Sequence, residues 1–193
     1  MQIIFDWGNL HFPLQDSLVT LVMNYFELFE MPVSLIVDQN KLLSQYAALQ
    51  KKYQPDVFSN TDRNDRGILE KSAMIHRGFT ILKDEDNTIK YVLELKGLLP
   101  KGEKYELPPE FLAETTGLNE GLMEGDILNI EEVETKIFQL QKSLYHAVQH
   151  IIEGYSDDII TEAQLLLVKD YYYKKKYLEG ILERLDGIRN IAG

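Results

Sequence analysis

The chain contains no cysteine among its 193 residues. This absence excludes disulfide bonds, cysteine-ligated zinc or iron–sulfur sites, and thiol catalysis by the chain itself. A sequence without thiols is consistent with a reducing compartment. Hydrophobic residues make up 45% of the sequence, which is enough for a packed core.

Long apolar runs and early basic residues are also missing. No run approaches the ~20 residues that a membrane-spanning helix needs. The first basic residue is Lys41, whereas a secretory signal needs a positive start and a mitochondrial presequence is rich in arginine. We therefore expect a cytoplasmic protein that does not engage a membrane.

Positive charge is scarce as well, because the formal net charge is −11. Residues 98–193 carry 18 acidic and 10 basic side chains, so this half accounts for most of the excess. Broad binding to nucleic acid requires clustered lysine and arginine. The tract Tyr171–Tyr177 mixes tyrosines and lysines as single-strand-binding platforms do, yet it lies in this acidic half. We expect no nucleic-acid partner; a basic protein partner suits the acidic half better.

Residues 1–22 differ from the rest of the chain. They contain the only tryptophan, no basic residue and no sustained hydrophobic period. We interpret them as an appended extension, with Met23 as the natural start. The alternative is an amphipathic arm that packs on the following domain.

The pattern from residue 23 to residue 97 predicts helices. A short apolar helix at 25–29 ends near Pro32. Asp38 is placed to cap a second helix, which ends before Pro55 because proline disfavours helix in the preceding residue. A long helix follows from Asp65 to Lys83. A shorter one runs from about Thr88 to Lys96 and stops at Gly97, a favourable residue for the end of a helix.

The second half predicts a three-helix antiparallel bundle after a connector at 98–107. Pro108 and Pro109 suit the first turn of a helix, but its glycines predict a frayed or short element. Residues 130–153 carry apolar side chains at helical spacing. We expect Ser156, Asp157 and Asp158 to cap a last helix over about 157–186. The predicted fold class is therefore all-α.

One helix stands out by its charge. Residues 39–55 contain no acidic side chain but three lysines, Lys41, Lys51 and Lys52. The Pro55-Asp56 turn follows directly. In a protein with a net charge of −11, this helix is a candidate docking surface for an acidic partner. The alternative is a solvated helix that ends in an ordinary turn.

Several tracts, in order, give the chain a family resemblance over residues 23–193. They are Asn24–Phe29, Leu49–Tyr53 with Pro55-Asp56 and Phe58, Tyr91–Gly97, Gly102–Pro108 with Phe111-Leu112, Leu118–Glu120, and Ile188–Ile191. On these residues the chain resembles the HscB family, the J-type co-chaperones of iron–sulfur cluster assembly.

The resemblance implies a J-domain at 23–97, a connector at 98–107 and a scaffold-binding helical bundle at 108–193. It implies two partners, a DnaK-type ATPase chaperone (HscA-like) and an iron–sulfur scaffold protein (IscU-like). The implied chaperone-binding residues are Lys41, Lys51, Lys52, Gln54, Pro55 and Asp56. The implied scaffold-binding residues are Leu112, Ala113, Thr116, Gly117, Glu120 and an aromatic at Tyr171 or Tyr172.

The sequence departs from the family pattern at Gln54, where the J-protein loop has histidine. Glutamine keeps hydrogen-bonding capacity but has no imidazole to gain a proton near neutral pH. Thr116 and Gly117 likewise replace a large apolar residue and an acid. Two alternatives follow: a scaffold-binding adaptor that no longer stimulates an ATPase, and a helical interaction protein with neither partner.

No pattern in the sequence predicts an enzyme, a metal centre or a cofactor. No phosphate-binding glycine loop and no nucleophile-elbow serine is present. His146 and His150 are spaced to share one helix face, but no third ligand is evident. We interpret them as exposed helix residues, and His76 as a surface or boundary residue.

Overall fold

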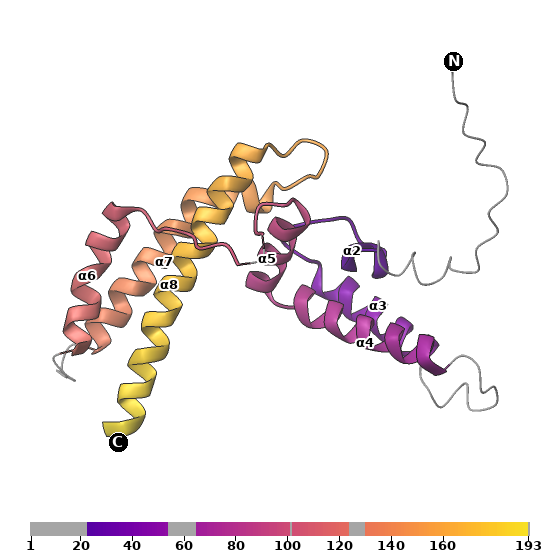
Figure 1. The fold of residues 1–193 in the computed structure, drawn as a ribbon, viewed down its shortest axis with the longest axis horizontal. Helices are drawn as coiled ribbons and strands as arrows, with labels where there is room; N and C mark the ends of the chain where they lie inside the picture. The colour runs from indigo at the N-terminus through magenta and orange to yellow at the C-terminus, as the bar shows by residue number, and fades with distance from the viewer. Residues whose placement is uncertain (1–22, 54–64, 101, 124–129, 193) are drawn as a thin grey trace, which may run out of the picture. The chain divides into compact units, whose positions relative to one another are not determined.

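The computed structural model describes residues 23–53, 65–100, 102–123 and 130–192. These residues form helices joined by turns, with no strand among them, so the predicted all-α class is confirmed (Figure 1). The helices are α2 (Tyr25–Leu28), α3 (Gln39–Lys52), α4 (Asp65–Leu82), α5 (Glu85–Leu95), α6 (Pro109–Met123), α7 (Ile130–Glu153) and α8 (Glu162–Ala192).

The described residues separate into two compact units. One comprises the residues up to Pro32 together with Leu42–Phe79. The other comprises Val33–Lys41 and the residues from Thr80 onward. Helix α5 thus groups with the C-terminal bundle, and the domain boundary at residue 97 stays a prediction. Residues 1–22 and the Gln54-Pro55-Asp56 turn lie outside the described residues.

The first unit is built on the pairing of α3 with α4, which lie side by side (Figure 1). The ring of Tyr46 on α3 stacks on that of Phe79 on α4, with centroids 3.9 Å apart. Helix α2 and the residue that caps its C-terminus add two fully buried phenylalanines, Phe26 and Phe29. It begins with a capping box, in which the Asn24 side chain and the Glu27 side chain each bond the other's backbone N–H.

The core of the second unit lies between α6, α7 and α8. Its members come from all three helices: Phe111, Leu118, Ile130, Val133, Ile137, Leu178, Ile181 and Leu185. The α7 members of this core come from the predicted apolar stripe along residues 130–153, so this helix is confirmed. The expectation that α6 would be short is wrong, since it runs for 15 residues. Burial of Phe111 and Leu118 offsets the cost of its glycines.

Helix α5 ends as predicted and begins earlier than predicted. It starts at Glu85 because Asp84 caps it, accepting a hydrogen bond from the Asn87 backbone N–H at 2.8 Å. Its C-terminus is a Schellman motif: Gly97 N–H bonds the Glu94 carbonyl and Leu98 N–H bonds the Leu93 carbonyl. Gly97 has a φ of +72°, a value that glycine adopts without strain.

Helix α8 begins later than predicted, at Glu162 rather than 157. The Ser156 carbonyl accepts from the backbone N–H groups of Ile159 and Ile160, which closes a separate turn before the helix. The cap is Thr161 instead. Its backbone N–H bonds the Gln164 side chain, while the Gln164 N–H bonds the Thr161 hydroxyl. The helix then continues to Ala192, six residues beyond the predicted end.

Candidate functional site

The exposed lysines of α3 are the first predicted site. Asp38 caps this helix as expected, since its carboxylate accepts from the N–H groups of Asn40 and Lys41, each at 3.0 Å. Lys41, Lys51 and Lys52 are all exposed. They therefore lie near the two ends of α3, one in its first turn and two in its last.

The solvent side of α3 between these lysines is not basic. We define the outer face of α3 as Leu43, Ser44, Ala47, Ala48 and Lys51, all exposed. Leu43 is 53% exposed, although it is a large apolar residue. The sequence prediction of a basic helix holds for the ends of α3 and misses this apolar centre. The missed signal was the spacing of Leu43, Ala47 and Lys51 at four-residue intervals.

The opposite side of α3 is fixed to α4 by polar and aromatic contacts. The hydroxyl of Tyr46 lies 2.7 Å from Nδ1 of His76 and accepts from the Gln50 side chain at 2.8 Å. His76 is exposed, which agrees with its interpretation as a surface or boundary residue. These contacts fix the rotation of α3 about its axis, and so fix which residues its outer face presents.

A basic residue that the sequence analysis did not single out lies at the C-terminal end of α3. The amino group of Lys71 on α4 is 5.4 Å from the centre of the Tyr53 ring, and that of Lys52 is 5.6 Å from it. Both distances are within the range of cation–π attraction. Lys71 therefore adds positive charge where α3 ends, just before the Gln54-Pro55-Asp56 turn.

The predicted scaffold-binding residues of α6 share one exposed face. Leu112, Ala113, Thr116 and Gly117 are all exposed, with Leu112 at 39%. The Thr116 hydroxyl donates to the Leu112 carbonyl at 2.8 Å, so its polar atom is occupied within the helix. We call these four residues the outer face of α6. The side chain of Glu120 lies outside the described residues.

The two aromatic candidates lie on α8 and differ in exposure. Tyr171 is only 5% exposed, and its ring meets that of Tyr145 edge-on at 6.2 Å. Little of Tyr171 is therefore available to a partner. Tyr172 is half-buried. Burial raises the pKa of Tyr172; the charge of Lys176 opposes this, and the nearby carboxylates of Asp86 and Glu94 on α5 add to it. This places Tyr172 toward α5.

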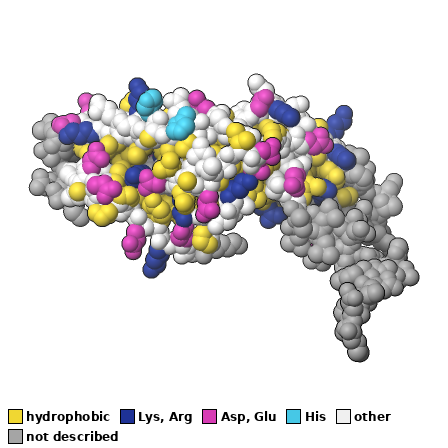
Figure 2. Space-filling model, turned by 90° about the horizontal axis from the view of Figure 1, so that it is seen from above, with side chains coloured by type: hydrophobic (Ala, Val, Ile, Leu, Met, Phe, Trp, Pro, Cys, Tyr) yellow, Lys and Arg dark blue, Asp and Glu magenta, His cyan; other side chains and the backbone are white. Residues whose placement is uncertain are grey.

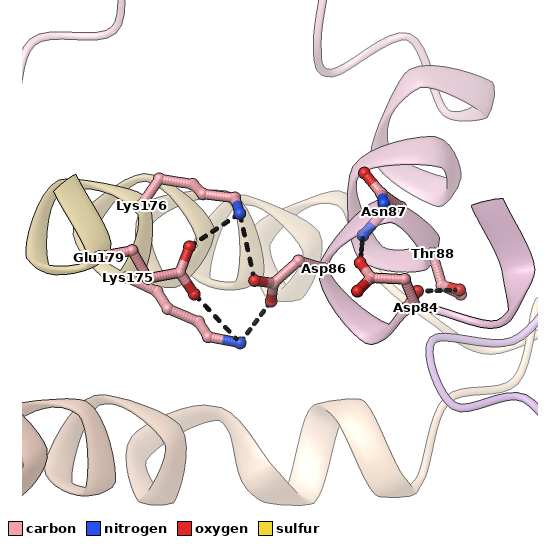
Figure 3. Close-up of polar contacts among 7 residues, drawn as sticks. All are labelled: Asp84, Asp86, Asn87, Thr88, Lys175, Lys176 and Glu179. Atoms are coloured by element: carbon pink, nitrogen blue, oxygen red, sulfur yellow. Dashed lines mark hydrogen bonds and ion pairs between the residues drawn. The ribbon is translucent and has the colours of Figure 1, made fainter. Parts of the chain in front are cut away.

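The lysines of the tyrosine–lysine tract are engaged in ion pairs. Asp86 on α5 accepts from both Lys175 and Lys176 on α8, the latter at 3.2 Å (Figure 3). Lys176 also pairs with Glu179 at 2.8 Å. Burial acts to raise the pKa of Asp86, but the hydrogen bond and charge of Lys175 and the charge of Lys176 outweigh it, so the pKa is lowered. These lysines stabilise the α5–α8 contact.

The face seen in Figure 2 bears lysines and arginines interspersed with acidic side chains. This arrangement differs from the continuous basic face that binds a phosphate backbone.

His146 and His150 are exposed. Within the described part of the chain, no group of three or more His, Cys, Asp or Glu side chains is arranged to hold a metal ion. No helix among the described residues is long and apolar enough to cross a membrane.

Comparison with known proteins gives the family. No family model matches the chain. A Co-chaperone protein HscB homolog of Shewanella woodyi is 30% identical over 171 residues, which covers 85% of this chain and 97% of that relative. The chain belongs to the HscB family. A Vibrio cholerae homologue of the same name is 39% identical over 102 residues, a match that covers 52% of this chain and only 60% of that relative.

Solved structures of HscB proteins resemble this HscB-family chain over most of its length. Chaperone HscB from Vibrio cholerae has a TM-score of 0.67 at 25% identity, covering 89% of this chain and all of that one. The crystal structure of human co-chaperone protein HscB has a TM-score of 0.69 at 25% identity, covering 86% of this chain and 81% of the human one. The resemblance predicted from the sequence is thereby confirmed.

Proposed function

We propose that this chain is a co-chaperone of iron–sulfur cluster assembly. It brings an IscU-like scaffold protein to a DnaK-type, HscA-like ATPase and stimulates ATP hydrolysis there. The observation that carries the proposal is the alignment with an HscB homologue over 97% of that relative's length. That relative is named a co-chaperone, and we extend this role to the present chain.

The described parts of the predicted chaperone-binding site support one part of the proposal, the interaction with the ATPase. Helix α3 has no acid in its first turn and ends with Lys51 and Lys52 exposed. Lys71 adds a third positive charge close to Tyr53. Positive groups gathered at one helix end attract an acidic partner. We propose that Lys41, Lys51, Lys52, Gln54, Pro55 and Asp56 form the chaperone-binding site.

The outer face of α6 supports the other part of the proposal, the binding of the scaffold protein. Its side chains are exposed, while Phe111 and Leu118 on the opposite side anchor the helix in the core. A fixed helix with an exposed leucine, Leu112, suits recognition of a partner protein. We propose that Leu112, Ala113, Thr116, Gly117 and Glu120 contact the scaffold, and that Tyr172 is the contributing aromatic on α8 in place of the buried Tyr171.

The test is single-turnover ATP hydrolysis by the HscA-like chaperone, with the scaffold protein and this chain added. We expect the unmodified chain to accelerate hydrolysis. Two variants accompany it: Gln54→His, which restores the imidazole, and Gln139→His, a control at an exposed position of α7. Failure of every variant to accelerate hydrolysis, despite binding to the chaperone, would contradict the stimulating role.

A second function is favoured by one residue. Gln54 stands where J-proteins have histidine, so the chain is also a candidate for an adaptor that binds the scaffold and leaves the ATPase unstimulated. In that case only Gln54→His accelerates hydrolysis, whereas the unmodified chain and Gln139→His do not. The same three proteins therefore separate the two functions.

A further inference from the structure

Exposed apolar side chains gather where α8 begins. Leu166 and Leu167, in the second turn of the helix, are 46% and 55% exposed. Ile159, in the turn that precedes the helix, is 75% exposed, the largest exposed fraction of any large apolar side chain among the described residues. Ala163 is exposed and lies three and four residues before the two leucines, so it shares their side of α8. We call these four residues the entry surface of α8.

The elements around α8 leave the entry surface open to solvent. Leu165 and Val168, on the other side of the same turns, are buried. The connector contacts a flank of the helix through Lys169. Helix α6 meets α8 about three turns later, where the rings of Phe111 and Tyr177 lie edge to face with centroids 5.8 Å apart. The entry surface is therefore an apolar patch that no described element covers, and such patches mark sites of interaction.

Two exposed carboxylates border this patch. Asp158 directly precedes Ile159 in the turn, and Glu162 directly precedes Ala163 at the start of the helix. Their two negative charges exceed the roughly half positive charge of a helix N-terminus. The entry surface thus combines apolar contact with a negative border, which favours a partner of positive charge.

We infer that the entry surface of α8 binds a segment of a third protein, in which apolar side chains are flanked by lysine or arginine. The three large apolar side chains supply the contact, and the two bordering carboxylates pair with the basic flanks. A second copy of this chain fits less well, because residues 98–193 carry 18 acidic and 10 basic side chains and two such halves repel each other. The inference goes beyond the proposed function, since this partner is neither the ATPase nor the scaffold.

The entry surface and the outer face of α6 can be occupied at the same time. Leu167 and Tyr177 are ten residues apart on one helix, which corresponds to about 15 Å along its axis. Tyr177 marks the level at which α6 begins, because its ring contacts Phe111, the neighbour of Leu112. A short segment on the entry surface therefore leaves Leu112 accessible to the scaffold.

The probe is a fluorescein-labelled peptide of leucine and lysine, about 14 residues long, with its leucines on one helix face. Fluorescence anisotropy follows its titration with the full chain. We expect saturable binding. A peptide of the same composition in scrambled order keeps the charge but loses the apolar face, so it should bind at least about fivefold more weakly. A peptide with glutamate in place of lysine should not bind.

Leu167→Ser and Leu69→Ser form a matched pair for this titration. Leu69 lies on α4 and is 56% exposed, almost the exposure of Leu167. We expect Leu167→Ser to weaken peptide binding roughly five- to tenfold, since the exposed half of a leucine is lost from the contact. Leu69→Ser should change the dissociation constant less than about twofold. Circular dichroism verifies that both variants keep their helices.

The charged border is tested by a second pair on the same helix. Glu162→Gln should weaken peptide binding about two- to threefold at about 0.05 M salt, and this difference should disappear at about 0.5 M salt, where exposed charges are screened. The control is Glu183→Gln, at an exposed position near the other end of α8, and it should have no effect.

Four results would overturn the inference. They are absence of peptide binding, equal binding of the ordered and scrambled peptides, equal effects of Leu167→Ser and Leu69→Ser, and loss of scaffold affinity in Leu167→Ser, which would assign the surface to the scaffold. Sedimentation supplies one further test: a dimer of the unmodified chain that Leu167→Ser dissociates would assign the surface to a second copy. None of these results depends on ATPase stimulation, so the proposed function is tested separately.

Discussion

Glu103 in the connector binds Lys169 on α8, with Nζ and Oε1 2.6 Å apart. Lys169 is only 8% exposed, so its charge is held in a largely dry environment. The neighbouring Tyr105 hydroxyl donates to Asp170 at 2.7 Å, and its ring stacks on Tyr173 at 4.2 Å. Three contacts thus fix the connector to α8, and this segment is an ordered part of the second unit.

The Glu103–Lys169 pair predicts an asymmetric response to mutation. Glu103→Gln leaves the buried ammonium without its carboxylate and should lower the free energy of unfolding by about 1–3 kcal/mol. Lys169→Met should cost less, because the orphaned Glu103 carboxylate is more exposed, at 25% of its side chain, and can be hydrated. Urea unfolding measures both. The control Glu132→Gln disrupts the exposed pair with Lys136 and should leave the stability almost unchanged, because solvent screens this pair.

Asp86 predicts a pH-dependent stability. Its pKa is lowered in the folded protein from the ordinary value of 3.8. The folded state therefore favours the carboxylate, so its contribution is complete above that ordinary value and is lost as the pH falls through the lower folded-state pKa. Asp86→Asn should lower the free energy of unfolding by about 1–2 kcal/mol at neutral pH. The difference from the unmodified chain should shrink below pH 3.8.

Urea unfolding at neutral and acidic pH tests this dependence. Glu94→Gln is the control, since Glu94 pairs with Lys90 at 3.9 Å on the exposed side of the same helix. The Glu94→Gln substitution should change the free energy of unfolding little at either pH. A loss of stability in Asp86→Asn that does not change with pH would contradict an ionic role for Asp86.

Gly78 is required by close packing in the first unit. A Cβ placed there would lie 2.8 Å from Cδ1 of Tyr25 and 2.9 Å from Cε2 of Phe29. Phe29 is fully buried and cannot move aside freely. Gly78→Ala should therefore destabilise the protein by about 1–3 kcal/mol, although alanine is the better helix former.

The matched control for Gly78 is Gly187→Ala on α8, where a Cβ would meet nothing within 4 Å. This change should stabilise the protein by up to about 1 kcal/mol. Thermal and urea unfolding of the two variants should thus move in opposite directions. Equal stabilisation by both alanines would show that α2 does not pack against Gly78.

Glu30 occupies a backbone conformation that suits glycine. Its φ is +51°, and it follows α2 as the residue whose N–H bonds the Glu27 carbonyl. Residues with a Cβ lose about 1–2 kcal/mol in this left-handed region. Glu30→Gly should therefore stabilise the first unit by up to about 1 kcal/mol, measured by urea unfolding. Destabilisation would indicate that the Glu30 side chain makes a compensating contact.

The outer face of α6 predicts scaffold binding. Leu112→Ser should weaken the affinity for the IscU-like scaffold by roughly five- to tenfold, because exposed apolar area is lost from the proposed contact. Isothermal titration measures it. Phe138→Ser on α7 is the control, since Phe138 is 66% exposed outside the proposed face. Equal losses in both variants would contradict the assignment of this face.

Local signals in the sequence predicted most of the helices. The apolar stripe at 130–153 predicts α7 because apolar residues recur at helical spacing through the whole segment. The start of α5 was missed although Asp84, Glu85 and Asp86 carry the acidic signature of a helix N-terminus. The start of α8 was missed because Ser156 and Thr161 both resemble caps, and only the fold selects between them.

Pairings between distant residues could not be predicted in the same way. Asp86 and Lys175 are 89 residues apart, and nothing in either neighbourhood indicates the partner. The same holds for Tyr105 and Asp170, which are 65 residues apart. At the candidate site, the charges of α3 could be predicted, whereas the rotation of that helix could not, because it depends on the contact of Tyr46 with Phe79. Exposure of Leu43 follows from that rotation.

The attachment of α5 decides how the protein can be divided. Asp86, near the start of α5, pairs with Lys175 and Lys176, and Lys96 at its end pairs with Asp157 at 2.6 Å. A recombinant fragment that starts at residue 98 would remove the partners that Asp86 and Lys96 provide to these lysines and to Asp157. A fragment that starts at Thr80 keeps α5 with the bundle, and it is the better candidate for crystallisation and for measuring scaffold affinity in isolation.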